Sequence, residues 1–362
     1  MSKTVAVAMS GGVDSSVAAL ILKQEGYDVV GITMRIWECG QDTGENTASK
    51  KLCCSLTDMQ DAKQVADKLK IPHYVLDFRK QFNKEIIMPF VDSYSKGITP
   101  NPCVMCNKKV KFDILLNKVL SMNINYLVTG HFAKIGFDRH LKQFVLKRGK
   151  DRTIDQSYWL YNLTQKQMEN ILLPLGGYTK AGVRQLAKKA SLPVADKPKS
   201  QEICFIQSGD YHEFIKDNKA GSPNCFIPGL IKDVNGKILG NHKGIAFYTV
   251  GQRRGLGIPA GKPIYVKSID AKNNIIIAGD YSQCLSEKLI VKDINLINTG
   301  IKFPVNAKVK IRFKHEGTDA VIDKIDNNAV QVKLNMPQFA VTPGQSAVFY
   351  QGDTVIGGGV IQ

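Results

Sequence analysis

The sequence has no apolar run long enough to cross a membrane, and a strand is predicted almost at its first residue. We therefore expect no membrane span, no secretory signal peptide and a cytoplasmic protein. Acidic residues are scarce, with 32 Asp and Glu against 49 Lys and Arg, a formal net charge of +17. This surplus favours a polyanionic partner such as nucleic acid, although a generally lysine-rich composition would also produce it.

Two common phosphate-binding fingerprints are also missing, namely the Gly-Lys-Ser/Thr ending of a Walker loop and the Gly-x-Gly-x-x-Gly of a dinucleotide fold. Residues 5–9 are instead a short apolar run, typical of a buried parallel strand, and Ser-Gly-Gly at residues 10–12 ends it. Apolar spacing from residue 15 onward then predicts a helix. A strand, a glycine turn and a helix N-terminus together predict an anion-binding site.

Further strands alternate with helices along the first part of the chain. They are predicted at residues 28–34, 73–77 and 126–129. Such alternation predicts an α/β doubly wound parallel sheet, in which ligands bind at the carboxyl ends of the strands. Residues 10–15, Met34, the loop at residues 97–106 and residues 130–131 should therefore surround one crevice.

The pattern changes after about residue 200 to short strands with frequent glycine, which predicts two small β domains, the last a β-barrel. The predicted strands are residues 237–239, 245–250, 264–268, 275–278, 305–312, 320–325, 329–334, 347–350 and 354–359. The predicted domains are residues 1–208, 209–283 and 284–362. Residues 251–257, a glycine-flanked basic turn, are either a solvated loop or a phosphate contact.

Eight cysteines in a cytoplasmic chain argue against a disulfide framework and favour chemistry for the clustered ones. Cys106 is predicted just before a helix, whose positive end would lower its thiol pKa, and lysines near Cys204 would act likewise. Alternatively, Cys103 and Cys106 could form a structural zinc site with Cys53 and Cys54. The isolated cysteines are predicted to be small buried residues; these are Cys39, Cys225 and Cys284.

Seven motifs occur in order along the chain. They are Ser-Gly-Gly-Val-Asp-Ser-Ser, Thr-Pro-Asn-Pro-x-x-x-Cys-Asn-Lys, Gly-His-Phe-Ala, Asp-Gln-Ser-Tyr, Ser-Gln-Glu-Ile-Cys-Phe-Ile, Thr-Val-Gly-Gln-Arg-Arg-Gly-Leu-Gly and Thr-Pro-Gly-Gln-Ser-Ala-Val-Phe-Tyr. This series resembles the tRNA-specific 2-thiouridylase family of PP-loop ATP pyrophosphatases, over essentially the whole chain. The resemblance implies an adenine nucleotide alpha hydrolase-like PP-loop domain, a central β domain and a C-terminal β-barrel that contacts tRNA.

The resemblance also implies a reaction, ATP-dependent 2-thiolation of the wobble uridine (U34) of tRNA. ATP with Mg²⁺ would adenylate O2, a protein persulfide would supply sulfur, and AMP and pyrophosphate would be released. The implied partners are tRNAs with Lys, Glu and Gln acceptors and a sulfur-relay protein or cysteine desulfurase. Such an enzyme is a tRNA-uridine 2-sulfurtransferase.

Site residues follow from the same resemblance. Cys204 would carry the persulfide, and Cys106 would be the nucleophile that closes a transient disulfide with it. ATP would bind Ala8, Met9, Ser10, Gly11, Gly12, Val13, Asp14, Ser15, Met34 and Gly130, with Asp14 also meeting Mg²⁺. The target base would lie at Asn101, Pro102 and Cys103. The tRNA would contact His131, Ile154, Asp155, Gln156, Arg312, Phe313 and Gln345.

One position departs from the family pattern, because many members have Asp where this chain has Cys103, and that Asp is the favoured general base. A thiol could replace it only if ionised. Alternatively, Cys103, Cys106 and Cys204 could hold an iron–sulfur cluster that delivers the sulfur. Two other function classes remain open, a PP-loop ligase or amidotransferase acting on a small molecule and a non-catalytic RNA-binding protein.

Overall fold

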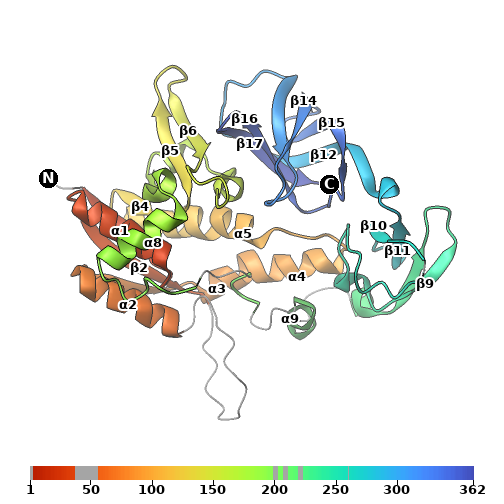
Figure 1. The fold of residues 1–362 in the computed structure, drawn as a ribbon, viewed down its shortest axis with the longest axis horizontal. Coiled ribbons are helices and arrows are strands. Elements are labelled where there is room, and N and C mark those ends of the chain that lie inside the picture. The colour runs from red at the N-terminus through yellow and green to blue at the C-terminus, as the bar shows by residue number, and fades with distance from the viewer. Residues whose placement is uncertain (1–2, 37–55, 199–202, 207–210, 219–222, 260) are drawn as a thin grey trace, which may run out of the picture. The chain divides into compact units, whose positions relative to one another are not determined.

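The structure of the chain, a computed structural model, describes residues 3–36, 56–198, 203–206, 211–218, 223–259 and 261–362 (Figure 1). The chain divides into two compact units, and each contains a buried core of its own. Unit 1 comprises Met1–Ile86, Cys103–Asp210 and Asp353–Val355. Unit 2 comprises Ile87–Pro102, Tyr211–Gly352 and Ile356–Gln362. The domain boundaries drawn from the sequence stay predictions.

Unit 1 is built on a parallel sheet with the strand order β3-β2-β1-β4-β7. Its strands are β1 (Thr4–Ala8), β2 (Asp28–Arg35), β3 (His73–Asp77), β4 (Tyr126–Val128) and β7 (Ile171–Leu172). The four strands predicted in this part of the chain are confirmed. The two-residue β7 was missed, because so short a strand leaves no periodic signal.

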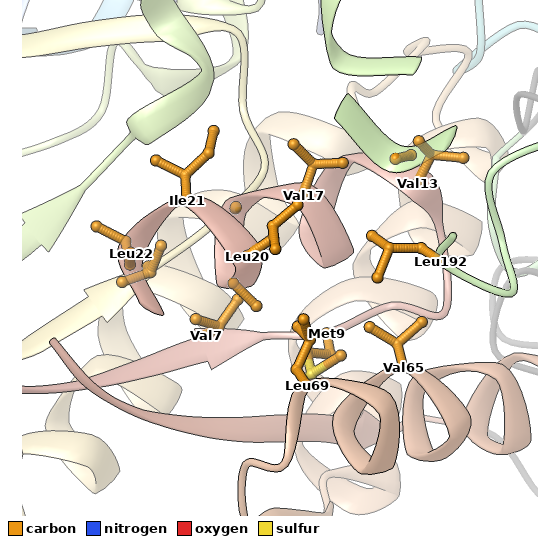
Figure 2. Close-up of a cluster of buried hydrophobic side chains, with 14 of the residues drawn as sticks. Val7, Met9, Val13, Val17, Leu20, Ile21, Leu22, Val65, Leu69 and Leu192 are labelled. Carbon is orange, nitrogen blue, oxygen red and sulfur yellow. The ribbon is translucent and has the colours of Figure 1, made fainter. Parts of the chain in front are cut away.

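The helical segments of unit 1 lie between these strands along the chain or after the last of them. They are α1 (Val13–Gln24), α2 (Leu56–Leu69), α3 (Arg79–Phe82), η1 (Asn83–Ile87), α5 (Pro102–Met105), η2 (Cys106–Leu115), α6 (Leu116–Ser121), η3 (Ser157–Leu160), α7 (Gln165–Met168), η4 (Pro174–Gly177) and α8 (Lys180–Lys189). The core shows why α1 and α2 fold against β1, since Val7, Val17 and Val65 are fully buried in one cluster (Figure 2). Each such side chain stabilises the fold by about 1.5–3 kcal/mol.

An antiparallel hairpin in unit 1, β5 (Ala133–Asp138) and β6 (Gln143–Arg148), was not predicted. Its turn contains neither glycine nor proline. Instead Asp138 Oδ1 accepts hydrogen bonds from the N–H groups of His140, at 3.0 Å, and Leu141, at 3.1 Å. The carboxylate thus replaces the usual turn residues, a role that Asp fills but that a glycine-based search misses.

The central part of unit 2 is a four-stranded sheet with the order β10-β11-β8-β9. Its elements are α4 (Met88–Ser95), α9 (Tyr211–Asn218), η5 (Pro223–Phe226), β8 (Gly229–Lys232), β9 (Ile238–His242), η6 (Ile245–Phe247), β10 (Tyr265–Asp270), β11 (Ile275–Gly279) and η7 (Ser282–Cys284). The strand predicted at residues 245–250 is wrong. Gly244, at φ +129°, turns the chain against the backbone of Cys225 and Phe226, and the apolar residues after it form η6.

The last part of unit 2 is a closed β-barrel with the strand order β12-β15-β14-β13-β16-β17. Its strands are β12 (Leu285–Leu296), β13 (Val305–Lys310), β14 (Thr318–Lys324), β15 (Ala329–Phe339), β16 (Ser346–Gln351) and β17 (Thr354–Ile361). Pairing of Val291 with Ile361 and of Lys292 with Val360 joins β12 to β17 and closes the barrel. The predicted class, a doubly wound α/β domain followed by β domains ending in a barrel, is confirmed.

Candidate active site

Residues 10–15, called here the glycine loop, carry the chain of unit 1 from β1 into α1. The Ser10 N–H donates to Ser15 Oγ at 3.2 Å, and the Ser15 hydroxyl lies 3.2 Å from the Gly12 carbonyl. Gly12 is the N-cap of α1, and no side chain caps the helix. The first N–H groups of α1 are therefore open to an anion, as the sequence predicts.

Two backbone approaches in this region leave room only for glycine. Gly11 has φ +68°, and a Cβ there would lie 2.2 Å from the carbonyl oxygen of Asp58 in α2. Gly130 follows β4, and a Cβ there would lie 2.8 Å from the backbone of both Asp14 and Ser15. The glycine loop is thus held between α2 and the end of β4.

A cavity of about 210 Å³ opens at the carboxyl ends of β1, β2 and β4. All the predicted ATP-binding residues line it except Gly11, Gly12 and Val13. Several polar residues that were not assigned to ATP also line it, namely Thr33, Asp58, Lys111, Thr129, His131 and Gln156. The position agrees with the crevice expected for a doubly wound sheet. Binding of ATP there stays a prediction.

Lys180, the first residue of α8, reaches the glycine loop. Its Nζ lies 2.5 and 2.7 Å from the two carboxylate oxygens of Asp14. Both side chains are partly buried, with exposed fractions of 22% for Lys180 and 33% for Asp14. Lys180 was not predicted as a site residue, because its helix is far from the glycine loop in sequence. A signal was nevertheless present, since Thr179 is a good N-cap and starts an amphipathic helix at Lys180.

A second ammonium group, that of Lys197, meets the other side of the glycine loop. It donates to the Gly11 carbonyl at 3.0 Å and to Asp58 Oδ1 at 2.5 Å, and it also pairs with Asp61. Burial lowers the pKa of Lys197, but the hydrogen bonds that its ammonium group donates to Asp58 and Asp61 outweigh this effect, so that the pKa is raised overall. Lys197 therefore stays charged at neutral pH and joins α2 to the loop.

The predicted tRNA-contacting residues of unit 1 point inward. His131 is buried, lies 2.7 Å through Nδ1 from Thr129 Oγ1, and has a pKa well below its usual value because of burial and of Lys111. Asp155 is 6% exposed and accepts hydrogen bonds from Gly149 N–H and from Ser157.

Their two neighbours are engaged in a similar way. Gln156 Oε1 accepts from Phe132 N–H at 2.9 Å, and Ile154 packs against the core cluster. The tRNA contacts of these four residues stay predictions, and their side chains are engaged within unit 1.

Cys106 does not lie in the predicted position just before a helix. Cys106 is inside a helical stretch, since α5 begins at Pro102 and runs into η2, so it does not precede the helix. Burial raises the pKa of the Cys106 thiol, and Lys111 offsets this only in part. The prediction of a lowered pKa is thus contradicted. Cys103 is exposed, and its role as a base stays a prediction.

Cys204 is partly exposed. The next residue anchors it, because Phe205 is 1% exposed and packs edge-on against Phe82 with ring centroids 5.8 Å apart. Among the described residues, which include Cys103, Cys106 and Cys204, no group of three His, Cys, Asp or Glu could hold a metal ion. An iron–sulfur cluster on these three cysteines stays a prediction. Cys39, Cys53 and Cys54 lie outside the described residues.

In unit 2, Gln345 supports the loop that carries Asn101 and Pro102. Its Nε2 donates to the carbonyls of Thr99, at 3.0 Å, and Pro100, at 3.2 Å. Thr99 N–H also donates to the Pro343 carbonyl at 3.0 Å. Gln345 therefore positions the chain just before the predicted target-base residues, and contact of its side chain with tRNA stays a prediction.

Cationic side chains of unit 2 lie on its barrel and in its central part. Arg312 donates to the Phe339 carbonyl at 3.1 Å, and the neighbouring Phe313 ring lies 5.8 Å from Lys310 Nζ. In the basic turn at residues 251–257, Gln252 braces the backbone, donating to the Arg254 carbonyl at 2.9 Å. Arg253 is exposed there and lines a second cavity, of about 460 Å³. Cys225 and Cys284 are buried, as predicted.

In the part of the chain that the structure describes, no helix has the length and apolar character needed to span a membrane.

Comparison with known proteins assigns the chain to a family. Three family models match, described as the tRNA methyl transferase HUP domain over residues 3–208, the tRNA methyl transferase PRC-barrel domain over residues 214–280 and the aminomethyltransferase beta-barrel domain over residues 286–361. A solved structure described as a predicted subunit of tRNA methyltransferase from Methanocaldococcus jannaschii is 18% identical, with a TM-score of 0.37, and covers 60% of this chain and 89% of that chain.

Two curated relatives match over their whole length. The tRNA-specific 2-thiouridylase MnmA of Acetivibrio thermocellus is 50% identical, covering 99% of this chain and 99% of the relative. The tRNA-specific 2-thiouridylase MnmA of Natranaerobius thermophilus is 48% identical, covering 100% of this chain and 98% of the relative. With the glycine loop, the cavity at the strand ends and the terminal barrel in place, the chain belongs to the tRNA-specific 2-thiouridylase MnmA family.

Proposed function

We propose that the chain is an ATP-dependent tRNA-uridine 2-sulfurtransferase that replaces O2 of the wobble uridine U34 by sulfur. The observation that carries the proposal is the cavity at the ends of β1, β2 and β4, where the uncapped start of α1 meets the glycine loop in a chain of the MnmA family. The net charge of +17 supports a nucleic-acid substrate.

The first step is adenylation. O2 of the uridine attacks the α-phosphorus of ATP, the bond to the bridging oxygen breaks, and pyrophosphate leaves with the electron pair. The N–H groups of α1 and the glycine loop suit the phosphates. Asp14, with phosphate oxygens, would hold Mg²⁺, which supplies charge neutralisation at the pyrophosphate. Activation must come first, because an amide-like carbonyl oxygen is a poor leaving group.

The second step is sulfur transfer. The terminal sulfur of a persulfide on Cys204 attacks C2, AMP leaves, and the base is joined to Cys204 through a disulfide bond. Cys106 then attacks the Cys204 sulfur, so that the 2-thiouridine departs and a Cys106–Cys204 disulfide remains. A dithiol reductant must restore both thiols. A sulfur-relay protein or a cysteine desulfurase would reload Cys204.

The raised pKa of Cys106 adds a requirement to this scheme. Burial keeps the thiol protonated at neutral pH in the free chain, and a thiol is a weak nucleophile. Binding of tRNA or formation of the adenylate must therefore remove the proton or bring a cation closer. Lys111 is suited to the second task, because it already opposes the effect of burial on Cys106 and lines the cavity.

The experiment is a thiolation assay with the whole chain, ATP, tRNA, cysteine and a cysteine desulfurase, with nucleosides identified by mass. We expect sulfur in place of oxygen at U34 of tRNAs for Lys, Glu and Gln. Cys204→Ser and Cys106→Ser should abolish it, whereas Cys284→Ser, a buried cysteine of unit 2, should not. A methylated nucleoside, as two of the family-model descriptions suggest, would overturn the proposal.

The iron–sulfur route is separated from the persulfide route by Cys103→Asp, which restores the residue common in the family. The persulfide route predicts full activity of Cys103→Asp. It also predicts that neither this variant nor the unaltered chain shows iron–sulfur absorption after anaerobic purification. Loss of both activity and a broad iron–sulfur absorption in Cys103→Asp would contradict it. Ligation of a small molecule without tRNA would instead support a PP-loop ligase.

A further inference from the structure

The proposed reaction assigns no role to Lys180, yet its ammonium group lies against the glycine loop. The start of α8 fixes its backbone, since Lys180 N–H donates to Asp151 Oδ2 at 3.1 Å and Thr179 Oγ1 caps the helix. From this fixed point the side chain reaches both carboxylate oxygens of Asp14, in the first turn of α1. The ammonium group is thus held beside the N–H groups that suit an anion.

The charges around the cavity need such a cation. Among the described residues that line it, Asp14 and Asp58 are carboxylates and Lys111 is the one ammonium group. The triphosphate of ATP is strongly anionic, and two carboxylates would repel it unless further cations approach. Lys197 is shared between Asp58 and Asp61. Lys180 pairs with a single carboxylate, so its charge is more readily available to a phosphate than the charge of Lys197.

The side chain is also able to change partner. It keeps 22% of its surface exposed, and its long flexible stem lets the head group rotate. The Nζ of Lys180 lies 5.6 Å from the centre of the Phe132 ring. This apolar ring does not bind the ammonium group as a carboxylate does. Rotation about the stem therefore allows the ammonium group to exchange an oxygen of Asp14 for one of phosphate.

We infer that Lys180 is a further nucleotide-binding residue, which binds the pyrophosphate part of ATP beside the start of α1. This inference rests on the proposed adenylation and adds the group that neutralises its leaving group. As the bond from the α-phosphorus to the bridging oxygen breaks, negative charge builds on the departing pyrophosphate, and a nearby ammonium group stabilises that charge.

Equilibrium binding to the whole chain without tRNA tests the inference, with ATP, inorganic pyrophosphate and AMP as ligands. In Lys180→Gln we expect the Kd for ATP and for pyrophosphate to rise about 10- to 100-fold, the usual range for loss of a charge-assisted hydrogen bond. The Kd for AMP, which lacks the pyrophosphate part, should change less than about twofold. Lys188→Gln, on the same helix but 61% exposed, is the matched control and should change no Kd.

A double-mutant cycle separates binding of phosphate from mere neutralisation of Asp14. If Lys180 binds pyrophosphate, Asp14→Asn with Lys180→Gln binds it more weakly than Asp14→Asn alone. Equal affinities of these two variants would overturn the inference. Lys180→Arg keeps the charge and should regain most of the affinity, so that a folding defect in Lys180→Gln does not decide the outcome.

The same measurements distinguish failure of this inference from failure of the proposed function. If the unaltered chain binds ATP and Lys180→Gln binds ATP and pyrophosphate as tightly, the inference is wrong and the proposed adenylation stands. If the unaltered chain binds neither ATP nor pyrophosphate, the inference and the proposed adenylation are both wrong.

Discussion

Lys197 should contribute strongly to the stability of unit 1, and Lys197→Met tests this. The substitution keeps the apolar stem and removes the ammonium group that joins Asp58, Asp61 and the Gly11 carbonyl. Breaking a fully buried ion pair costs about 3–5 kcal/mol, because it leaves a buried charge without its partner. The side chains here are 28%, 9% and 23% exposed, so we discount the cost to about 2 kcal/mol.

Urea unfolding followed by tryptophan fluorescence measures this cost, because Trp159 belongs to unit 1. With an m-value of about 2 kcal/mol/M, the midpoint should fall by about 1 M. The matched control is Lys63→Met, which breaks a helical pair whose side chains are 59% and 60% exposed and should cost less than about 0.5 kcal/mol. Equal midpoints for the two variants would refute the assignment of Lys197 to a stabilising cluster.

The pH dependence gives an independent check with a definite sign. The folded-state pKa of Lys197 is raised above its ordinary value of 10.5. Its contribution to stability is therefore complete below pH 10.5 and is lost as the pH rises through the folded-state pKa. The difference in unfolding free energy between the unaltered chain and Lys197→Met should be constant between pH 7 and 10 and shrink above pH 10.5. A difference that grew at alkaline pH would contradict this sign.

Three further predictions concern the glycine loop, the cysteines and the basic turn. Gly11→Ala should lower the unfolding free energy by about 1–3 kcal/mol and abolish ATP binding, because its Cβ would meet the backbone of α2. Its control is Gly26→Ala, which is also at positive φ but faces open space. This control isolates the effect of backbone strain and should keep ATP binding. Alkylation of Cys106, followed by peptide mass spectrometry, should accelerate only above pH 9 in the free chain, and rapid labelling at pH 7 would refute the raised pKa. Arg253→Gln should reduce the salt dependence of tRNA binding by about one unit of slope, and an unchanged slope would make the turn a solvated loop.

Local patterns in the sequence predict the parallel sheet, the glycine loop and most strands of the terminal barrel, whereas β8 (Gly229–Lys232) and the barrel strand β12 (Leu285–Leu296) were not predicted. Apolar runs specify buried strands, paired glycines specify the turn between β1 and α1, and alternation specifies the barrel. The exceptions have local reasons too, since Asp138 makes a turn without glycine and Gly244 ends an apparent strand.

Long-range packing establishes which charged groups meet at the glycine loop, and burial in the folded chain raises the pKa of Cys106. Lys180 and Lys197 are more than 160 residues from the glycine loop along the chain; packing of α8 against α1 brings Lys180 to it, and Lys197 reaches it beside Asp58 of α2. The pKa of Cys106 likewise depends on burial, which outweighs the local effect of nearby lysines and of the helix start. Long-range packing leaves no pattern in neighbouring residues, so the pairing of Asp14 with Lys180 was found in the fold and not in the sequence.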